Sequence, residues 1–267
     1  MEKYDIIILG GQSNAEGCGV GPADKEYVPI KDILYLEAEK IVVVNPEGMH
    51  ITYKKEPFII KEAEERLSDD GLLLGDLSLT FAKQYINNGL LHDGRKLLII
   101  RAAIGGTGFQ KRQWGLKDKV YLKMLEMIDY ALSLNSENKI VAFLWHQGEH
   151  DAFEGNAPEN YKRQLNSLLA GVRSRYGEIP FIAGDFVHEW KSKNVSICEP
   201  IIKAINEVVA QNNKCGFVET ADLPSNNQKI GNGDDIHFCR QSLCVLGERY
   251  FEMYKMINQV ALKMKEI

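Results

Sequence analysis

The feature that most constrains the fold of this 267-residue chain is an alternation of short apolar runs with segments of helical period. Four apolar runs are typical of buried strands, at residues 4–10, 96–103, 139–146 and 179–187, and residues 215–220 form a weaker fifth. Continuous apolar strands that alternate with helices favour a parallel sheet covered on both faces. The sequence therefore predicts a three-layer α/β/α fold around a doubly wound, mostly parallel sheet.

Helical periodicity occupies the segments between the predicted strands and the end of the chain. We expect helices within residues 73–89, 120–134, 161–177, 199–213 and 240–265. Residues 19–74 do not follow the alternation, and we interpret them as an insertion of loops and small strands. Residues 1–267 are interpreted as one domain, because a chain of this length with 45% hydrophobic residues can bury one large core.

Composition and charge argue against several kinds of partner. A net charge of −5 gives no reason to expect binding to nucleic acid. No apolar stretch approaches the roughly 20 residues that span a bilayer, and the N-terminus does not resemble a signal peptide, so no membrane association is predicted. The five cysteines form no C-x-x-C pair, which favours reduced thiols and a cytoplasmic location. The sequence makes no prediction of oligomeric state.

Polar and glycine-rich motifs follow the predicted strands. "GGQSN" (residues 10–14) follows the first strand, "IGGTGF" (104–109) the second and "HQGEHDA" (146–152) the third. "GDDIHF" (233–238) lies in a loop between the last strand and the last helix. Because the carboxyl ends of parallel strands meet at one edge of a sheet, we expect these four motifs to converge there.

Ser13 is the candidate nucleophile, because a sharp strand-to-helix turn would expose its hydroxyl. His237 is the candidate base, and Asp234, three residues earlier, is suitably spaced to bind one ring nitrogen while the other faces the serine. Each motif alone also fits an ordinary structural role. Ser13 or Asn14 would suit a helix cap, and His237 would suit an acidic surface turn.

Glycines and an amide are candidates for binding negative charge. Gly105 and Gly106 have no side chains, so a backbone N–H there can approach a substrate oxygen closely. The side chain of Gln147 is suited to donate to the same oxygen. An ordinary Gly-Gly turn and a hydrogen-bonded loop glutamine are the alternative interpretations.

Residues 146–150 match the H-x-x-E-H pattern of some zinc peptidases. That pattern requires both histidines on one face of a helix. Here the preceding residues favour a strand, and Gly148 would cost about 1 kcal/mol inside a helix. We therefore expect His146 to end a strand and Glu149 and Asp151 to begin a turn, and we predict no metal site.

Taken together, the four motifs resemble those of the SGNH hydrolase superfamily, and within it the carbohydrate esterase branch of sialate O-acetylesterases and acetylxylan esterases. The pattern of that branch is G-Q-S-N, G-G-T, H/Y-Q-G-E and D-x-x-H. This chain carries all four in order, at residues 11–14, 105–107, 146–149 and 234–237. The resemblance implies an SGNH-type, flavodoxin-like domain that acts as a serine O-acetylesterase on a small acetylated carbohydrate, of sialic acid or xylan type. The implied reaction requires no metal or organic cofactor.

The resemblance also implies roles for individual residues. It implies a Ser13–His237–Asp234 triad and an oxyanion hole formed by the N–H groups of Ser13 and Gly105 with the side chain of Gln147. Glu149 is a candidate auxiliary acid, because it lies on the same predicted edge. We expect substrate contacts from Gln12 and Asn14. Trp114 and Trp190 are also candidates, since an indole face suits the C–H face of a sugar, although each suits packing in the core equally well. Arg112 and His188 are weaker candidates.

Two other functions remain open from the sequence. One is an SGNH esterase or lipase that acts on non-carbohydrate esters. The other is a carbohydrate-binding module without catalytic activity, although Ser13, His237 and Asp234 are all present.

Overall fold

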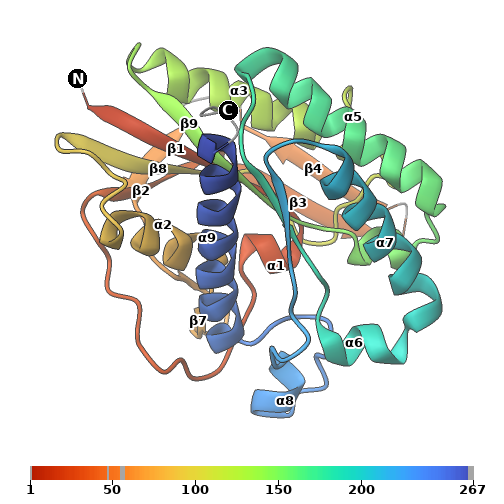
Figure 1. Ribbon diagram of the computed structural model, residues 1–267. Helices are drawn as coiled ribbons and strands as arrows, with labels where there is room; N and C mark the ends of the chain where they lie inside the picture. Colours follow the sequence, from red (N-terminus) through yellow and green to blue (C-terminus); the bar gives the residue numbers. More distant parts are fainter. Residues whose placement is uncertain (1, 47, 55–57, 264–267) are drawn as a thin grey trace.

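A seven-stranded sheet forms the centre of the molecule (Figure 1). The computed structural model describes residues 2–46, 48–54 and 58–263. The strand order is β11-β10-β9-β1-β8-β2-β5, and among the described pairs of this sheet only β2–β5 is antiparallel. This confirms the predicted, mostly parallel sheet. The strands are β1 (Lys3–Gly11), β2 (Ile33–Glu37), β5 (Ile59–Glu62), β8 (Arg95–Arg101), β9 (Lys139–His146), β10 (Phe181–Gly184) and β11 (Cys215–Val218).

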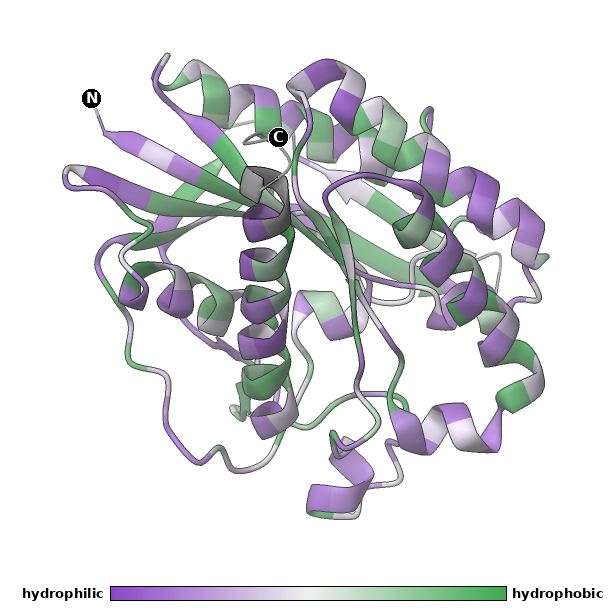
Figure 2. Cartoon of the chain, in the orientation of Figure 1, coloured by the Kyte–Doolittle hydropathy of each residue, from purple (hydrophilic) through white to green (hydrophobic). Residues whose placement is uncertain are grey.

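The run "IIIL" in β1 is continuously apolar because both faces of the sheet are covered. Ile6 and Ile8 belong to one buried cluster, and Ile7 and Leu9 belong to the other. Successive side chains of a strand point to opposite faces, so an apolar residue is needed at every position. In Figure 2 the inner strands are largely green, whereas the outer helices carry much purple.

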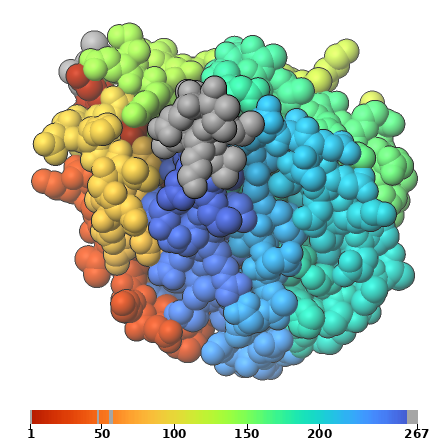
Figure 3. Space-filling view, in the orientation of Figure 1, coloured from red at the N-terminus to blue at the C-terminus, as the bar shows by residue number. Residues whose placement is uncertain are grey.

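Helices cover both faces of the sheet, as a doubly wound fold requires. Residues of α3 (Lys119–Ser133), α5 (Pro158–Tyr176) and α7 (Val195–Gln211) belong to the first buried cluster. Residues of α2 (Leu77–Asn87) and α9 (Arg240–Lys263) belong to the second. Figure 3 shows the dark-blue surface of α9 beside the gold surface of α2. All five helices lie where the periodicity predicted them, and α2 begins at Leu77 because the Asp76 side chain accepts a hydrogen bond from Ser78 N–H.

Residues 19–74 contain loops and small strands, as predicted, but part of this segment completes the central sheet. β2 pairs parallel with β8 and antiparallel with β5. The remaining strands form two separate pairs, β3 (Lys40–Asn45) with β4 (Gly48–Tyr53) and β6 (Arg66–Leu67) with β7 (Leu73–Leu74). Part of this segment therefore belongs to the central sheet, as its last two strands in the strand order.

Four short helices show no periodicity in the sequence, and of these only the first, after the strand-to-helix turn at Ser13, was expected. They are α1 (Ser13–Glu16), α4 (Glu149–Phe153), α6 (His188–Lys193) and α8 (Asn226–Ile230). Each is too short to show a hydrophobic period, and α1 and α4 follow strands β1 and β9 almost directly. In the part of the chain that the structure describes, no helix is both long and apolar enough to span a membrane.

Candidate active site

The turn after β1 brings Ser13 to the carboxyl edge of the sheet. Gly11 pairs with His146 of β9 and has a φ of 130°. A Cβ at this position would lie 2.1 Å from the carbonyl oxygen of His146, so the approach requires glycine. The N–H of Gln12 then donates to the same carbonyl at 2.9 Å, and α1 begins at Ser13.

Ser13, His237 and Asp234 form a continuous hydrogen-bonded chain. The distance from Ser13 Oγ to His237 Nε2 is 2.9 Å. His237 Nδ1 lies 2.9 Å from Asp234 Oδ2 and 3.0 Å from Asp234 Oδ1. Since an ionised carboxylate only accepts hydrogen bonds, Nδ1 carries a proton, and in the neutral imidazole Nε2 is left to accept one from the serine hydroxyl. The structure thus brings together the three residues in the order that a serine-histidine-acid triad requires.

The electrostatics of the pair favour a positive charge on His237. Burial raises the pKa of Asp234, but hydrogen bonds from His237 and Asn226 outweigh burial and hold that pKa below its usual value. Burial lowers the pKa of His237, but its contacts with Asp234 and Cys18 outweigh burial and raise that pKa above its usual value. Asp234 is therefore ionised at neutral pH and stabilises the imidazolium that forms when His237 accepts a proton.

The loop that carries His237 is supported from α8. Asn226 Nδ2 donates to Asp234 Oδ2 at 2.8 Å, and its backbone N–H donates to the carbonyl of His237 at 2.9 Å. The N–H of Asn227 donates to the carbonyl of Asp234 at 2.8 Å. Sequence analysis did not single out Asn226, because a short polar helix before the "GDDIHF" motif carries no period and no family pattern.

Asn14 attaches the same loop to the strand edge. Its side chain accepts from the N–H of Phe238 at 3.1 Å and donates to the carbonyl of Ile236 at 3.1 Å. Asn14 Nδ2 also donates to Glu149 Oε1 at 2.8 Å. Asn14 therefore holds the residues on either side of His237, and Glu149 orients Asn14.

Glu149, the candidate auxiliary acid, is fully buried at the start of α4. Burial raises its pKa, and the hydrogen bond from Asn14 partly opposes this. Among the described residues no hydrogen bond joins Glu149 to His237. In this arrangement Glu149 acts on the His237 loop through Asn14.

The predicted oxyanion donors have protein partners in this structure. The N–H of Gly105 donates to Glu16 Oε2 at 2.7 Å. Gln147 Nε2 donates to Asp151 Oδ2 at 2.6 Å and lies 3.2 Å from the carbonyl of Thr107. Within the described residues, no hydrogen bond of the Ser13 N–H is found. Gly105 and Gln147 must therefore exchange a hydrogen bond before either can bind a new oxygen.

Three predicted substrate contacts need correction, because the side chains are buried. Trp114 has 0% of its surface exposed, and its indole Nε1 donates to Thr107 Oγ1 at 2.9 Å. Gln12 and Asn14 are 3% and 0% exposed, and Gln12 Oε1 accepts from the N–H of His150 at 3.1 Å. These residues support the site from within and present almost no surface to solvent. Trp190 is also buried and packs against Phe186, whereas His188 and Arg112 are exposed.

The H-x-x-E-H match does not form a helical metal site. His146 ends β9, as predicted, and its Nδ1 lies 3.0 Å from the hydroxyl of Tyr250. His150 lies in α4, beyond Gly148, whose φ is 145°. Glu149 and Asp151 lie in this helix and not in a turn, which corrects the prediction. Within the residues described by the structure, no cluster of three or more His, Cys, Asp and Glu residues could hold a metal ion.

Known proteins match the chain at the levels of family and fold. No curated protein sequence is significantly similar to this one. The family described as "carbohydrate esterase, sialic acid-specific acetylesterase" matches residues 3–256. The structure is similar to that of NanS, with a TM-score of 0.72 and 17% identity over 97% of this chain and 98% of the other. A protein from Arabidopsis thaliana gives a TM-score of 0.70 at 18% identity, over 96% of this chain and 99% of the other.

A carbohydrate acetylesterase from Xanthomonas citri gives a TM-score of 0.60 at 17% identity. This similarity covers 95% of the present chain but 56% of that protein. At such identities these three structures establish a common fold, and the family match carries the assignment.

Proposed function

Because this chain belongs to the carbohydrate esterase family of sialic acid-specific acetylesterases, we propose that it removes O-acetyl groups from a small sugar with Ser13 as the nucleophile. Membership of the family makes it a carboxylic ester hydrolase. An acetylated sugar of the sialic acid type is the proposed substrate, on the strength of the family description, and an acetylated xylan-type sugar is the alternative to be tested.

The observation that carries the proposed mechanism is the chain of contacts from Asp234 through His237 to Ser13. With Nε2 of His237 2.9 Å from Ser13 Oγ, the imidazole is within reach of the hydroxyl proton. Ser13 Oγ attacks the acetyl carbonyl carbon as its proton passes to His237, and Asp234 stabilises the resulting imidazolium. His237 then returns the proton to the sugar oxygen as the acetyl–sugar bond breaks. Water attacks the acetyl-enzyme by the same route and releases acetate.

The tetrahedral intermediates carry a negative oxygen that requires hydrogen-bond donors. The N–H of Ser13 has no competing acceptor among the described residues, so it is the first donor in this mechanism. Gly105 contributes a second N–H once its hydrogen bond to Glu16 is exchanged. A single donor of this kind is worth about 3 kcal/mol of transition-state stabilisation.

The proposal is tested with Ser13→Ala on three substrates: an O-acetylated sialic acid, an acetylated xylooligosaccharide and p-nitrophenyl acetate. We expect kcat to fall by on the order of 10⁴ or more on every substrate that the wild type hydrolyses. We also expect the wild type to prefer the sialic acid ester. A Ser13→Ala protein that retains a tenth of the wild-type activity would exclude Ser13 as the nucleophile.

A further inference from the structure

Glu16 lies beside the nucleophile and was not singled out by sequence analysis. Ser13 and Glu16 are the first and last residues of α1, and a spacing of three places them on one side of a helical turn. A Cβ built on Gly105 would lie 3.3 Å from Glu16 Oε2 and 3.5 Å from Ser13 Cβ. The Glu16 carboxylate, the Gly105 backbone and the Ser13 side chain therefore meet at one point.

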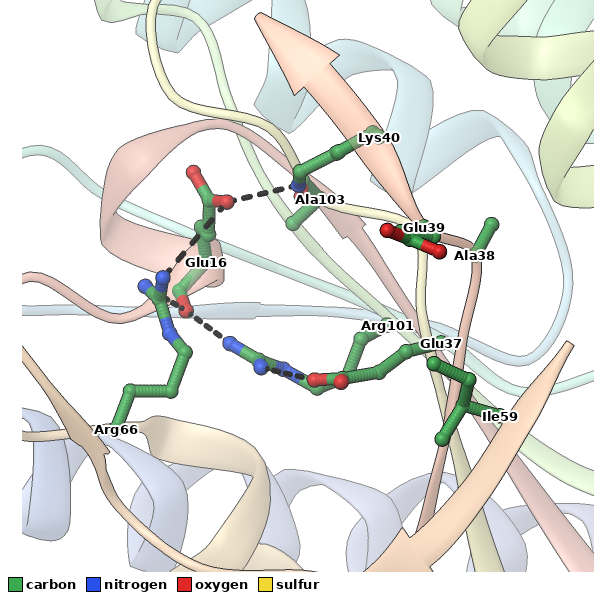
Figure 4. Close-up of a pocket in the computed structure, with 9 residues that line it drawn as sticks. All are labelled: Glu16, Glu37, Ala38, Glu39, Lys40, Ile59, Arg66, Arg101 and Ala103. Atoms are coloured by element: carbon green, nitrogen blue, oxygen red, sulfur yellow. Dashed lines mark hydrogen bonds and ion pairs between the residues drawn. The ribbon is translucent and has the colours of Figure 1, made fainter. Parts of the chain in front are cut away.

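Two cations hold the Glu16 carboxylate in this position. Lys40 Nζ lies 2.8 Å from Glu16 Oε1, while Glu16 Oε2 accepts the Gly105 N–H at 2.7 Å. Arg66 Nη1 is 4.0 Å from Glu16 Oε1. Figure 4 shows the Glu16 side chain between Lys40 and Arg66. Burial raises the pKa of Glu16, but Lys40, Arg66 and the Gly105 N–H outweigh burial and lower it, so the group is ionised at neutral pH.

A second position is open to the Glu16 carboxylate. A cavity of about 240 Å³ lies next to Glu16 and is lined by Lys40, Arg66 and Arg101, among other residues. Arg101 is bonded to Glu37 and to the backbone carbonyl of Glu16. Arg66 donates to the backbone carbonyls of Glu16 and Gly17 through Nη2, while its Nη1 lies 4.0 Å from Glu16 Oε1, on the side of the cavity. A rotation of the side chain from Gly105 towards Arg66 would keep the carboxylate paired with a cation.

We propose that Glu16 controls access to the Gly105 N–H. In the free enzyme the Glu16 carboxylate blocks this oxyanion donor, and it moves towards Arg66 when Ser13 attacks the acetyl ester. An N–H has one proton, so Gly105 cannot donate to Glu16 and fully to an oxyanion together. A carboxylate left on Gly105 would also repel the negative oxygen. This inference rests on the proposed function, because it assigns Gly105 to the oxyanion site of an acyl transfer at Ser13.

Three variants test the proposal against one matched control. Glu16→Ala removes the competing acceptor, while the bonds from Arg66 and Arg101 to the backbone carbonyl of residue 16 can remain. Glu16→Gln keeps a weaker, neutral acceptor for Gly105. Glu16→Ala combined with Lys40→Met also removes the cation that would be left unpaired, and serves if the single variant folds poorly. The control is Glu39→Gln, because Glu39 lines the same cavity but pairs with Lys54.

Two reactions that need no sugar recognition provide the readouts. One is hydrolysis of p-nitrophenyl acetate. The other is the single-turnover reaction with diethyl p-nitrophenyl phosphate, in which Ser13 Oγ bonds to phosphorus, p-nitrophenolate leaves and the serine proton passes to His237. The phosphoryl oxygen of this uncharged reagent occupies the oxyanion site, so its rate reports on the donors directly.

We expect Glu16→Ala to raise kcat/KM and the phosphorylation rate about three- to tenfold, and Glu16→Gln to raise both less, since a charge-assisted hydrogen bond no longer has to be exchanged. Glu39→Gln should change both rates by less than about twofold, because an exposed ion pair such as Glu39–Lys54 contributes little energy. A decrease, or no change, in the folded Glu16 variants would overturn the proposal, because Glu16 would then position Gly105 or be irrelevant to it. If the wild type forms no adduct at Ser13, the proposed function itself fails.

Discussion

The two sides of Ser13 differ in how their hydrogen-bonding groups are used. On the base side, His237 is bonded to Asp234 and to Ser13, and the supporting bonds from Asn226 and Asn14 lead towards the same loop. On the oxyanion side, Gly105 and Gln147 donate to the carboxylates of Glu16 and Asp151.

This difference separates proton transfer from charge stabilisation. The base side is preorganised in the free protein, since its groups already have the geometry that the reaction needs. The oxyanion side must exchange hydrogen bonds as negative charge develops, which preorganised sites avoid. Removing a base-side residue should therefore only slow the reaction, whereas removing an oxyanion-side competitor should accelerate it.

The strongest test of the base side is Asp234→Asn. We expect kcat to fall by about 10⁴, the loss associated with a triad aspartate, because the tautomer and the charge that orient His237 are both lost. Asp235→Asn is the matched control, since Asp235 is the neighbouring residue and pairs with Lys193. Kinetics on p-nitrophenyl acetate measure both. Equal losses in the two variants would contradict the assignment of Asp234.

A smaller loss is expected from Glu149→Gln. A glutamine can still accept the hydrogen bond from Asn14 Nδ2, so the His237 loop should stay in place. Exchanging the carboxyl acceptor for an amide is worth about 1 kcal/mol, or less than about tenfold in kcat. A loss larger than that of Asp234→Asn, with circular dichroism unchanged, would make Glu149 the principal acid. Two mild single variants with an inactive double would show that the acids share the role.

The pH profile reports on the same pair of residues. His237 must be neutral to accept the serine proton, so kcat/KM should rise with pH through the pKa of His237 in the free enzyme. Asp234 raises that pKa, and Asp234→Asn should therefore move the acid limb of the residual activity to lower pH. Asp235→Asn should leave the limb in place. An unmoved limb in Asp234→Asn would mean that another group controls it.

The central strands could be predicted from the sequence because burial on both faces leaves a continuous apolar run. β9 has the bounds that the pattern predicted, Lys139–His146. β2 was assigned to an insertion, since its five residues carry no sign that they pair with β8, which follows far along the chain. The single-domain organisation and the cytoplasmic location stay predictions.

The candidate catalytic residues could be predicted from the sequence, but the residues that hydrogen-bond to and support them could not. Ser13, His237 and Asp234 fall in motifs that follow strands, and strand edges converge by topology. Glu16 and Asn226 act through contacts with other elements of the fold, which no local pattern encodes. The burial of Trp114 was missed for a related reason, because an aromatic residue after a glycine-rich turn can face either a ligand or the core.

The smallest effect on activity is expected from Trp114→Phe, which tests whether the tryptophan supports the oxyanion side from within. Its indole packs edge-on against Trp145, with 5.0 Å between ring centroids, and Nε1 donates to Thr107 Oγ1. Thr107 Oγ1 in turn donates to the carbonyl of Ile104 at 2.6 Å, which braces the turn that contains Gly105.

Phenylalanine would keep an aromatic ring in the core but leave a void and an unpaired acceptor on Thr107. We expect the free energy of unfolding to fall by about 2 kcal/mol, from the lost hydrogen bond and the void together. KM for an acetylated sugar should change by less than about twofold, because no sugar touches a side chain without exposed surface. Urea denaturation and steady-state kinetics measure the two effects. A tenfold rise in KM with unchanged stability would instead place Trp114 against the substrate. The oxyanion side would then have to open further than a movement of Glu16 alone allows.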